Sequence, residues 1–363
     1  MDILPIDKWL KNYEHPLIVG GPCSAETEIQ VLETAIELAK IKRLKIFRAG
    51  IWKPRTRPNN FEGVGSKGLV WLKRVKEETG LLTAVEVATP QHVSEALANE
   101  VDILWIGART VVNPFSVQEI ADSLSGVDIP VMIKNPVNPD LKLWIGTIER
   151  LYRAGIRKII AVHRGFYYFD KTPFRNAPMW EIPIELKRLI PNLPIICDPS
   201  HICGKRDLIY NIAQRAFDLE MDGLMLEVHA HPEKALTDAR QQITPDQLSD
   251  LLSRLVIRKT SGNDEFENKL EELRREIDKL DDELVNILSR RMEIVKEIGE
   301  YKKENDITIL QLKRWSEIIH NRLENATRAG INRDFLIRLF ELVHKEAIQI
   351  QSEIMENGKL PGK

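Results

Sequence analysis

The sequence lacks the features that mark membrane and secreted proteins. Among its 363 residues, no apolar run approaches the roughly 18–20 residues that a membrane-spanning helix needs. The first sixteen residues do not follow the basic-then-apolar order of a signal peptide. Only three cysteines are present, an odd number, which indicates a reducing compartment rather than a framework of disulfides. We therefore expect a cytoplasmic protein that binds no membrane.

The chain also carries little net charge. Its 52 Lys and Arg residues nearly balance its 54 Asp and Glu residues, so the formal net charge is −2. This balance does not favour nucleic acid as a partner. A local cluster of cations therefore needs a local explanation. The stretch IFRAGIWKPRTRP, residues 46–58, contains such a cluster just after an apolar run, namely Arg48, Lys53, Arg55 and Arg57.

Proline and glycine are scarce in the C-terminal hundred residues. Eighteen of the 19 prolines and 15 of the 19 glycines precede residue 264, and the composition after it is typical of helices. The polar stretch KTSGND between them reads as a linker or a helix start. We therefore divide the chain into a first domain of residues 1–258, a linker of residues 259–264 and a helical domain of residues 265–363.

Short apolar runs typical of strands recur through the first domain. They lie at 17–21, 45–50, 81–88, 102–108, 130–135, 158–165, 194–198 and 223–228. Each is separated from the next by a segment long enough for a helix. Eight such units predict an α/β fold, the (β/α)8 TIM barrel. The rival, a doubly wound open sheet, usually has a glycine-rich dinucleotide motif after its first strand, and this sequence has none.

A barrel of this kind places its chemistry at the C-terminal ends of its strands. Nearly every predicted strand here ends in an ionisable residue: Cys23, Arg48, Glu86, Arg109, Lys134, His163, Arg164, Asp198, His201, Glu227 and His229. The cations among them would repel one another in one barrel mouth unless they bind an anion. Guanidinium groups match the geometry of phosphate and carboxylate, and so many cations suggest more than one anionic group.

A second group near the strand ends carries the donor atoms of a metal site. Cys23, His201, Glu227 and, later, Asp238 offer a thiolate, an imidazole and two carboxylates. Their spacing matches no compact metal motif, so only their shared position favours a metal. A buried thiol, a helix-capping histidine and two surface acids are the simpler interpretation of each residue taken alone.

The order of these residues resembles a known family. Over about the first 255 residues the chain is similar to the 3-deoxy-D-arabino-heptulosonate 7-phosphate (DAHP) synthases of the shikimate pathway, and to their short-barrel members. The matching segments are GPCS (21–24), FRAGIWKPRT (47–56), GART (107–110), IKNP (133–136), HRG (163–165), DPSH (198–201), MLEVH (225–229) and LTDARQQ (236–242).

The resemblance implies roles for these residues. A divalent metal, Mn, Fe, Co or Zn, would be bound by Cys23, His201, Glu227 and Asp238. Phosphoenolpyruvate would be held by Arg48, Lys53, Arg109, Lys134 and Arg164, with Glu86 and Ala108 as further substrate-binding residues. The phosphate of erythrose 4-phosphate would lie near Arg55 and Thr56. Lys53 would also assist proton transfer.

The implied reaction is an aldol-like condensation. Polarisation of the aldehyde of erythrose 4-phosphate by a metal ion would let C3 of phosphoenolpyruvate attack it. Water would add to C2, and phosphate would leave. Two alternatives stay open. One is the related synthase that uses arabinose 5-phosphate, although KPRT at 53–56 favours the four-carbon sugar; the other is a Schiff-base aldolase that uses Lys134.

The second domain begins with a regular apolar pattern. Steps of four and three residues join Phe266, Leu270, Leu273, Ile277, Leu280, Leu284, Ile287, Ile294 and Ile298, and the missing member of the series, position 291, is Arg. This pattern predicts one long helix with a heptad seam and a cation inside it. The cation either fixes the register of the seam or belongs to a site.

Distances along this helix bear on that choice. Arg291 and Lys302 are 11 residues apart, about 16 Å on nearly the same face, so their side chains can close on one small anion. Arg274 lies 28 residues from Lys302, about 42 Å in a straight helix. If Arg274 joins the site it must come from a second chain, which predicts at least a homodimer.

This domain resembles the all-helical chorismate mutases over about residues 264–355. The matching segments are residues 273–305, Arg314–Trp315 and LFELVHKEAIQIQ (339–351). The resemblance implies an all-α dimeric domain that binds the carboxylates of chorismate through Arg291, Arg314 and Arg274 from a partner chain. Lys302 and Gln351 would hydrogen-bond the ether oxygen. The chain departs from the family at Gln311, Trp315 and Ala347, near the chorismate hydroxyl.

Two hypotheses account for the fusion of the domains. The tail is either a working mutase that converts chorismate to prephenate, or mainly a ligand-sensing module that regulates the barrel. The fused family members suggest that prephenate or chorismate, bound to the tail, inhibits the synthase. The sequence thus predicts a bifunctional enzyme that uses phosphoenolpyruvate, erythrose 4-phosphate and chorismate, with prephenate as an effector.

Overall fold

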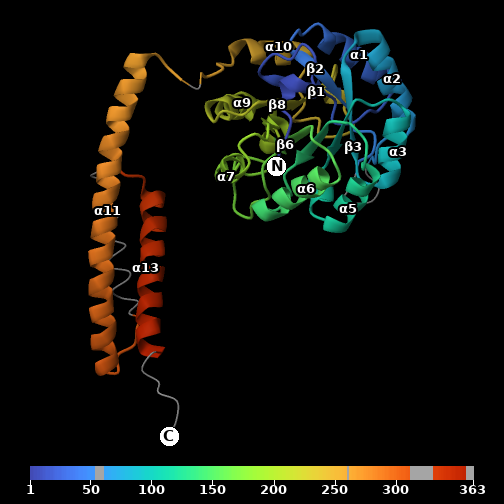
Figure 1. Cartoon of the computed structure of the whole chain (residues 1–363). Coiled ribbons are helices and arrows are strands. Elements are labelled where there is room, and N and C mark those ends of the chain that lie inside the picture. Colours follow the sequence, from blue (N-terminus) through green and yellow to red (C-terminus); the bar gives the residue numbers. More distant parts are fainter. Residues whose placement is uncertain (54–60, 260, 311–329, 357–363) are drawn as a thin grey trace. The chain divides into compact units, whose positions relative to one another are not determined.

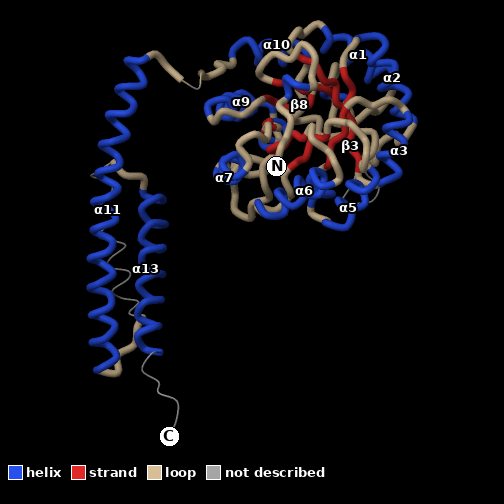
Figure 2. The backbone as a smooth tube through the Cα atoms, viewed as in Figure 1, coloured by secondary structure: helices blue, strands red, loops and turns tan. Residues whose placement is uncertain are grey.

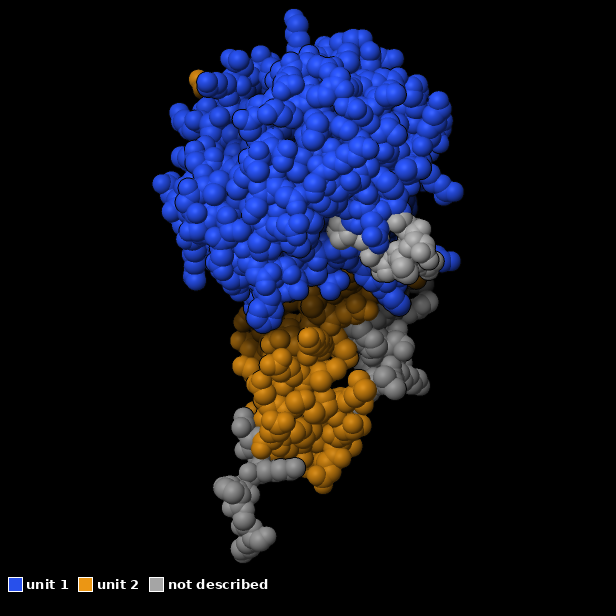
Figure 3. Space-filling model, turned by 90° about the vertical axis from the view of Figure 1, so that its right-hand side faces the viewer, with its two compact units in different colours: residues 1–260 blue, residues 261–363 orange. Residues whose placement is uncertain are grey.

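A computed structural model describes residues 1–53, 61–259, 261–310 and 330–356 (Figure 1). The chain divides into two compact units, residues 1–260 and residues 261–363, coloured blue and orange in Figure 3. Three predicted site residues, Arg55, Thr56 and Arg314, lie outside the described residues, as do Gln311 and Trp315. None of the described helices combines the length and the apolar character needed to cross a bilayer.

The first unit contains a closed barrel of eight parallel strands in sequential order, drawn in red in Figure 2. The strands are β1 (Leu17–Gly21), β2 (Leu44–Arg48), β3 (Leu82–Val87), β4 (Ile103–Ile106), β5 (Val131–Lys134), β6 (Ile159–His163), β7 (Ile195–Cys197) and β8 (Gly223–Glu227). Closure joins β1 to β8 in a register that runs from Leu17 opposite Gly223 to Gly21 opposite Glu227. The predicted TIM barrel is therefore confirmed, and the doubly wound sheet was the wrong alternative.

Helices cover the outside of the barrel. They are α1 (Glu28–Ala39), α2 (Lys67–Thr79), α3 (Pro90–Ala98), α5 (Pro114–Ser123), α6 (Leu141–Arg153), α7 (Glu181–Leu189), α9 (Ile209–Asp218) and α10 (Pro245–Arg254). Two short helices, α4 (Ala108–Val111) and α8 (Pro199–Cys203), and the 3-10 turns η1 (Ile6–Lys8), η2 (Arg206–Leu208) and η3 (Pro232–Lys234) complete the described elements. Polar side chains cap the first turn of several helices. In the capping box of α10, for example, the Thr244 hydroxyl accepts from the backbone N–H of Gln247.

The core of this unit has two layers. The larger layer lies between strands and helices, and the smaller one fills the barrel interior with residues such as Val19, Trp105 and Met132. Ile6 and Leu10 from the N-terminal segment belong to the interior layer. Because they precede β1 and lie at the N-terminal end of the strands, they close the floor of the barrel opposite the C-terminal strand ends.

The second unit contains two long described helices, α11 (Asp264–Glu304) and α13 (Arg333–Glu356). The side chain of Asn263 accepts from the Phe266 amide and caps the start of α11. The helices approach closely at Gly299, where a Cβ atom would lie 3.0 Å from Ile354 and 3.1 Å from Gln351. The predicted long helix and the all-α character of this domain are confirmed.

The apolar seam of α11 is exposed along most of its length, including Ile294 and Ile298 near its C-terminal end. Val295 and Gly299, which are not part of the seam, are the buried residues of this helix. Leu280 is 62% exposed and Ile287 is 63% exposed, and Leu273, Ile277 and Leu284 are exposed as well. Most of the seam therefore has no cover among the described residues of one chain.

The closure of the barrel generates a prediction at Gly223. A Cβ atom there would lie 2.1 Å from the Leu17 carbonyl oxygen, a backbone atom that cannot move without opening the β1–β8 pairing. We expect Gly223→Ala to lower the free energy of unfolding by more than about 2 kcal/mol because of this overlap. Denaturant unfolding of the full chain measures the loss.

Gly146 in α6 provides the matched control. A Cβ atom at Gly146 would meet no atom within 4 Å, so Gly146→Ala is expected to gain up to about 1 kcal/mol from helix propensity. If Gly223→Ala were as stable as the parent chain, the tight β1–β8 closure would be contradicted.

Candidate active sites

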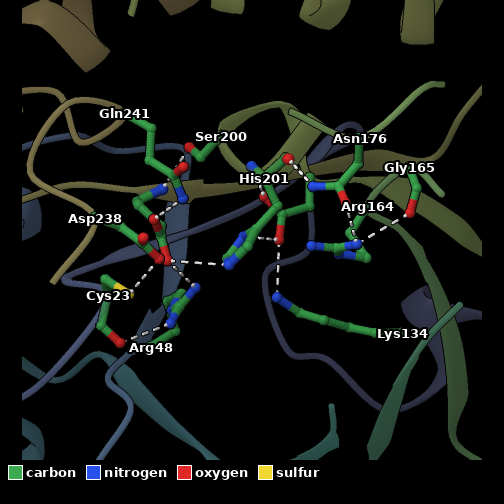
Figure 4. Close-up of polar contacts among 12 residues, drawn as sticks. Cys23, Arg48, Lys134, Arg164, Gly165, Asn176, Ser200, His201, Asp238 and Gln241 are labelled. Carbon is green, nitrogen blue, oxygen red and sulfur yellow. Dashed lines mark hydrogen bonds and ion pairs between the residues drawn. The ribbon is translucent and has the colours of Figure 1, made fainter. Parts of the chain in front are cut away.

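The predicted site residues of the barrel meet at the C-terminal ends of the strands (Figure 4). Arg48, Lys134 and Glu227 are the last residues of β2, β5 and β8. Cys23 follows β1 by two residues and is fully buried. The register of β1 on β8 places Gly21 opposite Glu227 and so delivers Cys23 beside the Glu227 carboxylate.

A cluster of candidate metal ligands lies in this mouth. Ligand atoms of Cys23, Glu227 and Asp238 all lie within 4.8 Å of one another. The distance from the Cys23 Sγ to the Asp238 Oδ2 is 3.4 Å. One sulfur and two carboxylate oxygens at this separation fit a single divalent ion.

His201 stands beside this cluster of three. Its Nε2 lies 3.5 Å from the Glu227 Oε1, and its Nδ1 lies 2.8 Å from the Asp198 Oδ2. A carboxylate behind one ring nitrogen directs the other nitrogen toward the ion in many metal sites. Three of the four predicted ligands thus form one cluster, and His201 lies beside it at Glu227, with the Asp198 carboxylate near its other ring nitrogen. Sequence reasoning did not identify this role of Asp198.

The charge balance of the cluster also fits a cation. Burial and the Glu227 carboxylate raise the pKa of Cys23 to about 12, against the opposing effect of Lys53. Burial alone would raise the pKa of Glu227, but the His201 ring and the Arg48 guanidinium lower it. The Arg175 guanidinium and the His201 ring likewise lower the pKa of Asp238 against the effect of burial. Two carboxylates are therefore ionised beside a thiol whose deprotonation needs further positive charge, which a divalent ion would supply.

Asp238 is held by residues that sequence reasoning missed. The Arg175 guanidinium donates to the Asp238 Oδ1 at 2.9 Å and to the Gln241 Oε1 at 2.8 Å. The Gln241 amide donates to the Glu227 Oε2 at 2.6 Å. Gln241 lies in the segment LTDARQQ and was within reach of a motif argument, whereas Arg175 lies in the loop between β6 and α7 and carries no local signal.

The cations divide between the two sides of the mouth. The Lys53 ammonium donates to the Cys23 carbonyl at 2.9 Å and to its Sγ at 3.2 Å. Burial alone would lower the pKa of Lys53, but Cys23 and Glu86 raise it, so the side chain is an ammonium at neutral pH. Glu86 packs against Gly107, where a Cβ atom would lie only 2.0 Å from its Oε1.

On the other side, Lys134 and Arg164 form a partly compensated positive patch. The Lys134 ammonium lies 2.8 Å from the Asp198 Oδ2. Within the described part of the chain, the Arg164 guanidinium donates only to neutral oxygens, the Asn176 Oδ1 at 2.8 Å and the Gly165 carbonyl at 3.3 Å. Burial lowers the pKa of Arg164 to about 10, and Arg175 and Arg109 contribute to the shift. Arg109 follows Ala108 in α4 and is exposed.

The helical unit holds a second group of predicted site residues. Gln351 is 8% exposed, and its Oε1 has no hydrogen-bond partner among the described residues. Burial, Arg291 and Lys302 together lower the pKa of His344, a residue that sequence reasoning did not single out. Three of the predicted mutase residues, Arg291, Lys302 and Gln351, therefore gather with His344 along α11 and α13.

Arg274 does not belong to this group within one chain. It lies in the N-terminal part of α11, is exposed, and has the Glu271 carboxylate 4.0 Å away. Lys302, near the other end of the helix, donates to the Ile309 carbonyl at 2.7 Å. The prediction that Arg274 acts across a dimer stays a prediction.

Comparison with known proteins assigns both units to families. Residues 10–261 match the DAHP synthetase I family, and residues 273–352 match chorismate mutase type II. A phospho-2-dehydro-3-deoxyheptonate aldolase of Thermotoga maritima is 32% identical over 238 residues, which are 66% of this chain and 68% of that protein. A 2-dehydro-3-deoxyphosphooctonate aldolase of Desulfotalea psychrophila is 31% identical over 66% of this chain and 88% of its own length.

Solved structures agree with this assignment. The crystal structure of the phospho-2-dehydro-3-deoxyheptonate aldolase (DAHP synthase) of Thermotoga maritima superposes with a TM-score of 0.60 at 29% identity, over 69% of this chain and 72% of that one. A truncated form of the synthase from the same organism gives a TM-score of 0.58 at 28% identity. The chain thus belongs to the DAHP synthetase I family and carries a chorismate mutase type II domain, which makes it a bifunctional enzyme of the shikimate pathway.

Proposed function

We propose that the barrel mouth binds phosphoenolpyruvate, erythrose 4-phosphate and a divalent metal, and that the helical unit, as a dimer, binds chorismate and regulates the barrel through prephenate. The observation that carries the first part is the cluster of Cys23, Glu227 and Asp238, with ligand atoms within 4.8 Å beside buried cations. His201 is the proposed fourth ligand. When bound, the ion would act as a Lewis acid on the aldehyde.

The cations would bind and orient phosphoenolpyruvate. Lys134 and Arg164 suit its carboxylate or phosphate, because the Arg164 guanidinium has only neutral hydrogen-bond acceptors among the described residues. Arg48 and Lys53 flank the Cys23 carbonyl and would hold the other end of the molecule near the ligand cluster. Fixing both reactants this way removes much of the entropic barrier to condensation.

Because Lys53 is protonated, it suits the role of a proton donor rather than that of a base. Because its ammonium lies 3.2 Å from the Cys23 Sγ and its pKa is raised, it can stabilise a thiolate and donate a proton to a developing alkoxide. This is the form that we propose for its part in proton transfer.

Loss of the metal is expected to abolish phosphate release from phosphoenolpyruvate and erythrose 4-phosphate while mutase turnover persists. The reason is that all four proposed ligands lie in the barrel unit. The full chain is treated with a chelator, freed of it and assayed for both reactions, and Mn, Fe, Co and Zn are then added back singly to identify the active ion.

Two outcomes would contradict this assignment. Synthase activity that survives complete metal removal would favour the Schiff-base reaction at Lys134. Faster phosphate release with arabinose 5-phosphate than with erythrose 4-phosphate would favour the alternative sugar.

The helical unit has the groups that a dianion requires. Arg291, Lys302 and His344 gather near Gln351, whose amide nitrogen donates to the Ala347 carbonyl at 3.2 Å and would be the group that donates to a ligand oxygen. Chorismate rearranges in one unimolecular step, so binding its compact conformer and stabilising charge on the breaking C–O bond suffices. The exposed seam of α11 supports a dimer, in which a second chain would cover Leu280 and Ile287 and supply Arg274.

Arg291→Ala is expected to lower mutase kcat/KM by about 10²–10³-fold, because the site would lose its central cation. Synthase activity without effector should stay unchanged. The exposed neighbour Arg290 gives the matched control, since Arg290→Ala removes the same charge one residue away. Equal losses in the two variants would show that general charge, not a site at Arg291, explains the effect.

Deletion of residues 262–363 tests the regulatory part of the proposal. The barrel unit has its own closed sheet and core, so the remaining residues should fold and condense the two substrates. We expect inhibition by prephenate to disappear in the truncated chain and in full-length Arg291→Ala. Inhibition that persists in the truncated chain would place the effector site in the barrel.

A further inference from the structure

Arg48 is a buried cation whose described partners compensate its charge only in part. It is 1% exposed at the end of β2. Its guanidinium lies 3.4 Å from the Glu227 Oε1 and donates to the Cys23 carbonyl at 3.2 Å. Among the described residues its Nε has no hydrogen-bond partner. A buried charge is costly unless it is well paired, so a further stabilising contact is expected.

The carboxylate partner of Arg48 is heavily shared. Glu227 also accepts from the Gln241 amide at 2.6 Å and lies 3.5 Å from the His201 Nε2. It further belongs to the cluster of three candidate metal ligands. Each competing positive or donating group reduces the part of the Glu227 charge that is available to Arg48.

Trp105 supplies a contact that is independent of Glu227. It lies in β4, is fully buried, and faces the barrel interior. The Arg48 Cζ lies 4.8 Å from the centroid of its ring. Ala84, the residue paired with Arg48 on β3, belongs to the same interior layer as Trp105.

We infer that Trp105 is a positioning residue of the synthase reaction: the face of its indole ring holds the Arg48 guanidinium in the barrel mouth, ready for phosphoenolpyruvate. The inference rests on the proposed role of Arg48 in binding that substrate. A tryptophan face is the best aromatic partner for a cation, and desolvation strengthens the attraction. The Trp105 Nε1 has no hydrogen-bond partner among the described residues, so the ring face rather than the N–H group carries the effect.

The first test compares an aromatic and an aliphatic replacement in the full-length, metal-loaded enzyme. Trp105→Phe keeps a ring face and is expected to leave KM for phosphoenolpyruvate within about threefold of the parent value. Trp105→Leu keeps only apolar bulk and is expected to raise it about tenfold, with KM for erythrose 4-phosphate unchanged. Thermal unfolding of both variants shows whether a change in KM accompanies lost stability.

Trp71 provides the matched control. It is a largely buried tryptophan on α2 with the Lys67 ammonium 5.6 Å from its ring centroid, outside the proposed site. Trp71→Leu should reduce stability without changing KM for phosphoenolpyruvate. A rise in KM as large as that of Trp105→Leu would overturn the inference, because any lost core tryptophan would then have the same effect.

A second measurement avoids the cavity that a smaller residue at position 105 would leave. Fluorinated tryptophan keeps nearly the same shape but weakens the negative face of the ring. Incorporated at all seven tryptophans, it should raise KM for phosphoenolpyruvate in the parent enzyme but not in Trp105→Phe. Equal KM values for the fluorinated and ordinary parent enzymes would overturn the inference even if Trp105→Leu failed to fold.

One further variant separates this inference from the function it rests on. If Arg48→Ala leaves KM for phosphoenolpyruvate unchanged, the role of Arg48 as a substrate ligand fails, and the inference about Trp105 falls with it. If Arg48→Ala raises KM while the Trp105 variants and the fluorinated enzyme do not, only the inference about Trp105 is wrong.

Discussion

The Glu227 carboxylate is the interaction point on which the barrel site depends. It is fully buried, contacts Arg48 and Gln241, and lies within 4.8 Å of the Cys23 and Asp238 ligand atoms. Its position follows from the closure of the sheet, because the β1–β8 register sets Gly21 opposite Glu227. A fold-level constraint, the joining of the first and last strands, thus determines where opposite charges meet in a buried position. The cations and hydrogen-bond donors around Glu227 offset the cost of burying its charge.

Much of this arrangement was predictable from the sequence, because the residues that end successive parallel strands of a barrel meet at the same end of it. Eight spaced apolar runs predicted the strands, and the residues that end them, such as Arg48, Lys134 and Glu227, converge as parallel strands require. Asp238 lies beyond the last strand, so its place in the group of metal donors was the weakest part of that pattern, and the family resemblance supplied its role. Arg175 was missed because its partner is 63 residues away and its loop has no periodicity. Long-range pairing of polar side chains leaves no trace in local patterns.

In the helical unit, by contrast, a single helix sets most of the distances between the predicted site residues. A helix of 41 residues is a rod, so spacing along it gives distances directly. That is why the sequence sufficed to separate Arg274 from Lys302. It did not reveal His344, which lies on another helix and joins the group through the packing of α13 on α11 at Gly299. The seam of α11 is exposed, and Arg291 interrupts its apolar series, so apolar association is weakened at that position.

The closed floor of the barrel restricts the route by which molecules can reach the site. Ile6 and Leu10 pack beneath the interior layer that contains Val19 and Trp105, so the strand axis is plugged at one end. Molecules that bind in the barrel mouth would therefore enter and leave at the same end of the barrel, where the C-terminal ends of the strands lie.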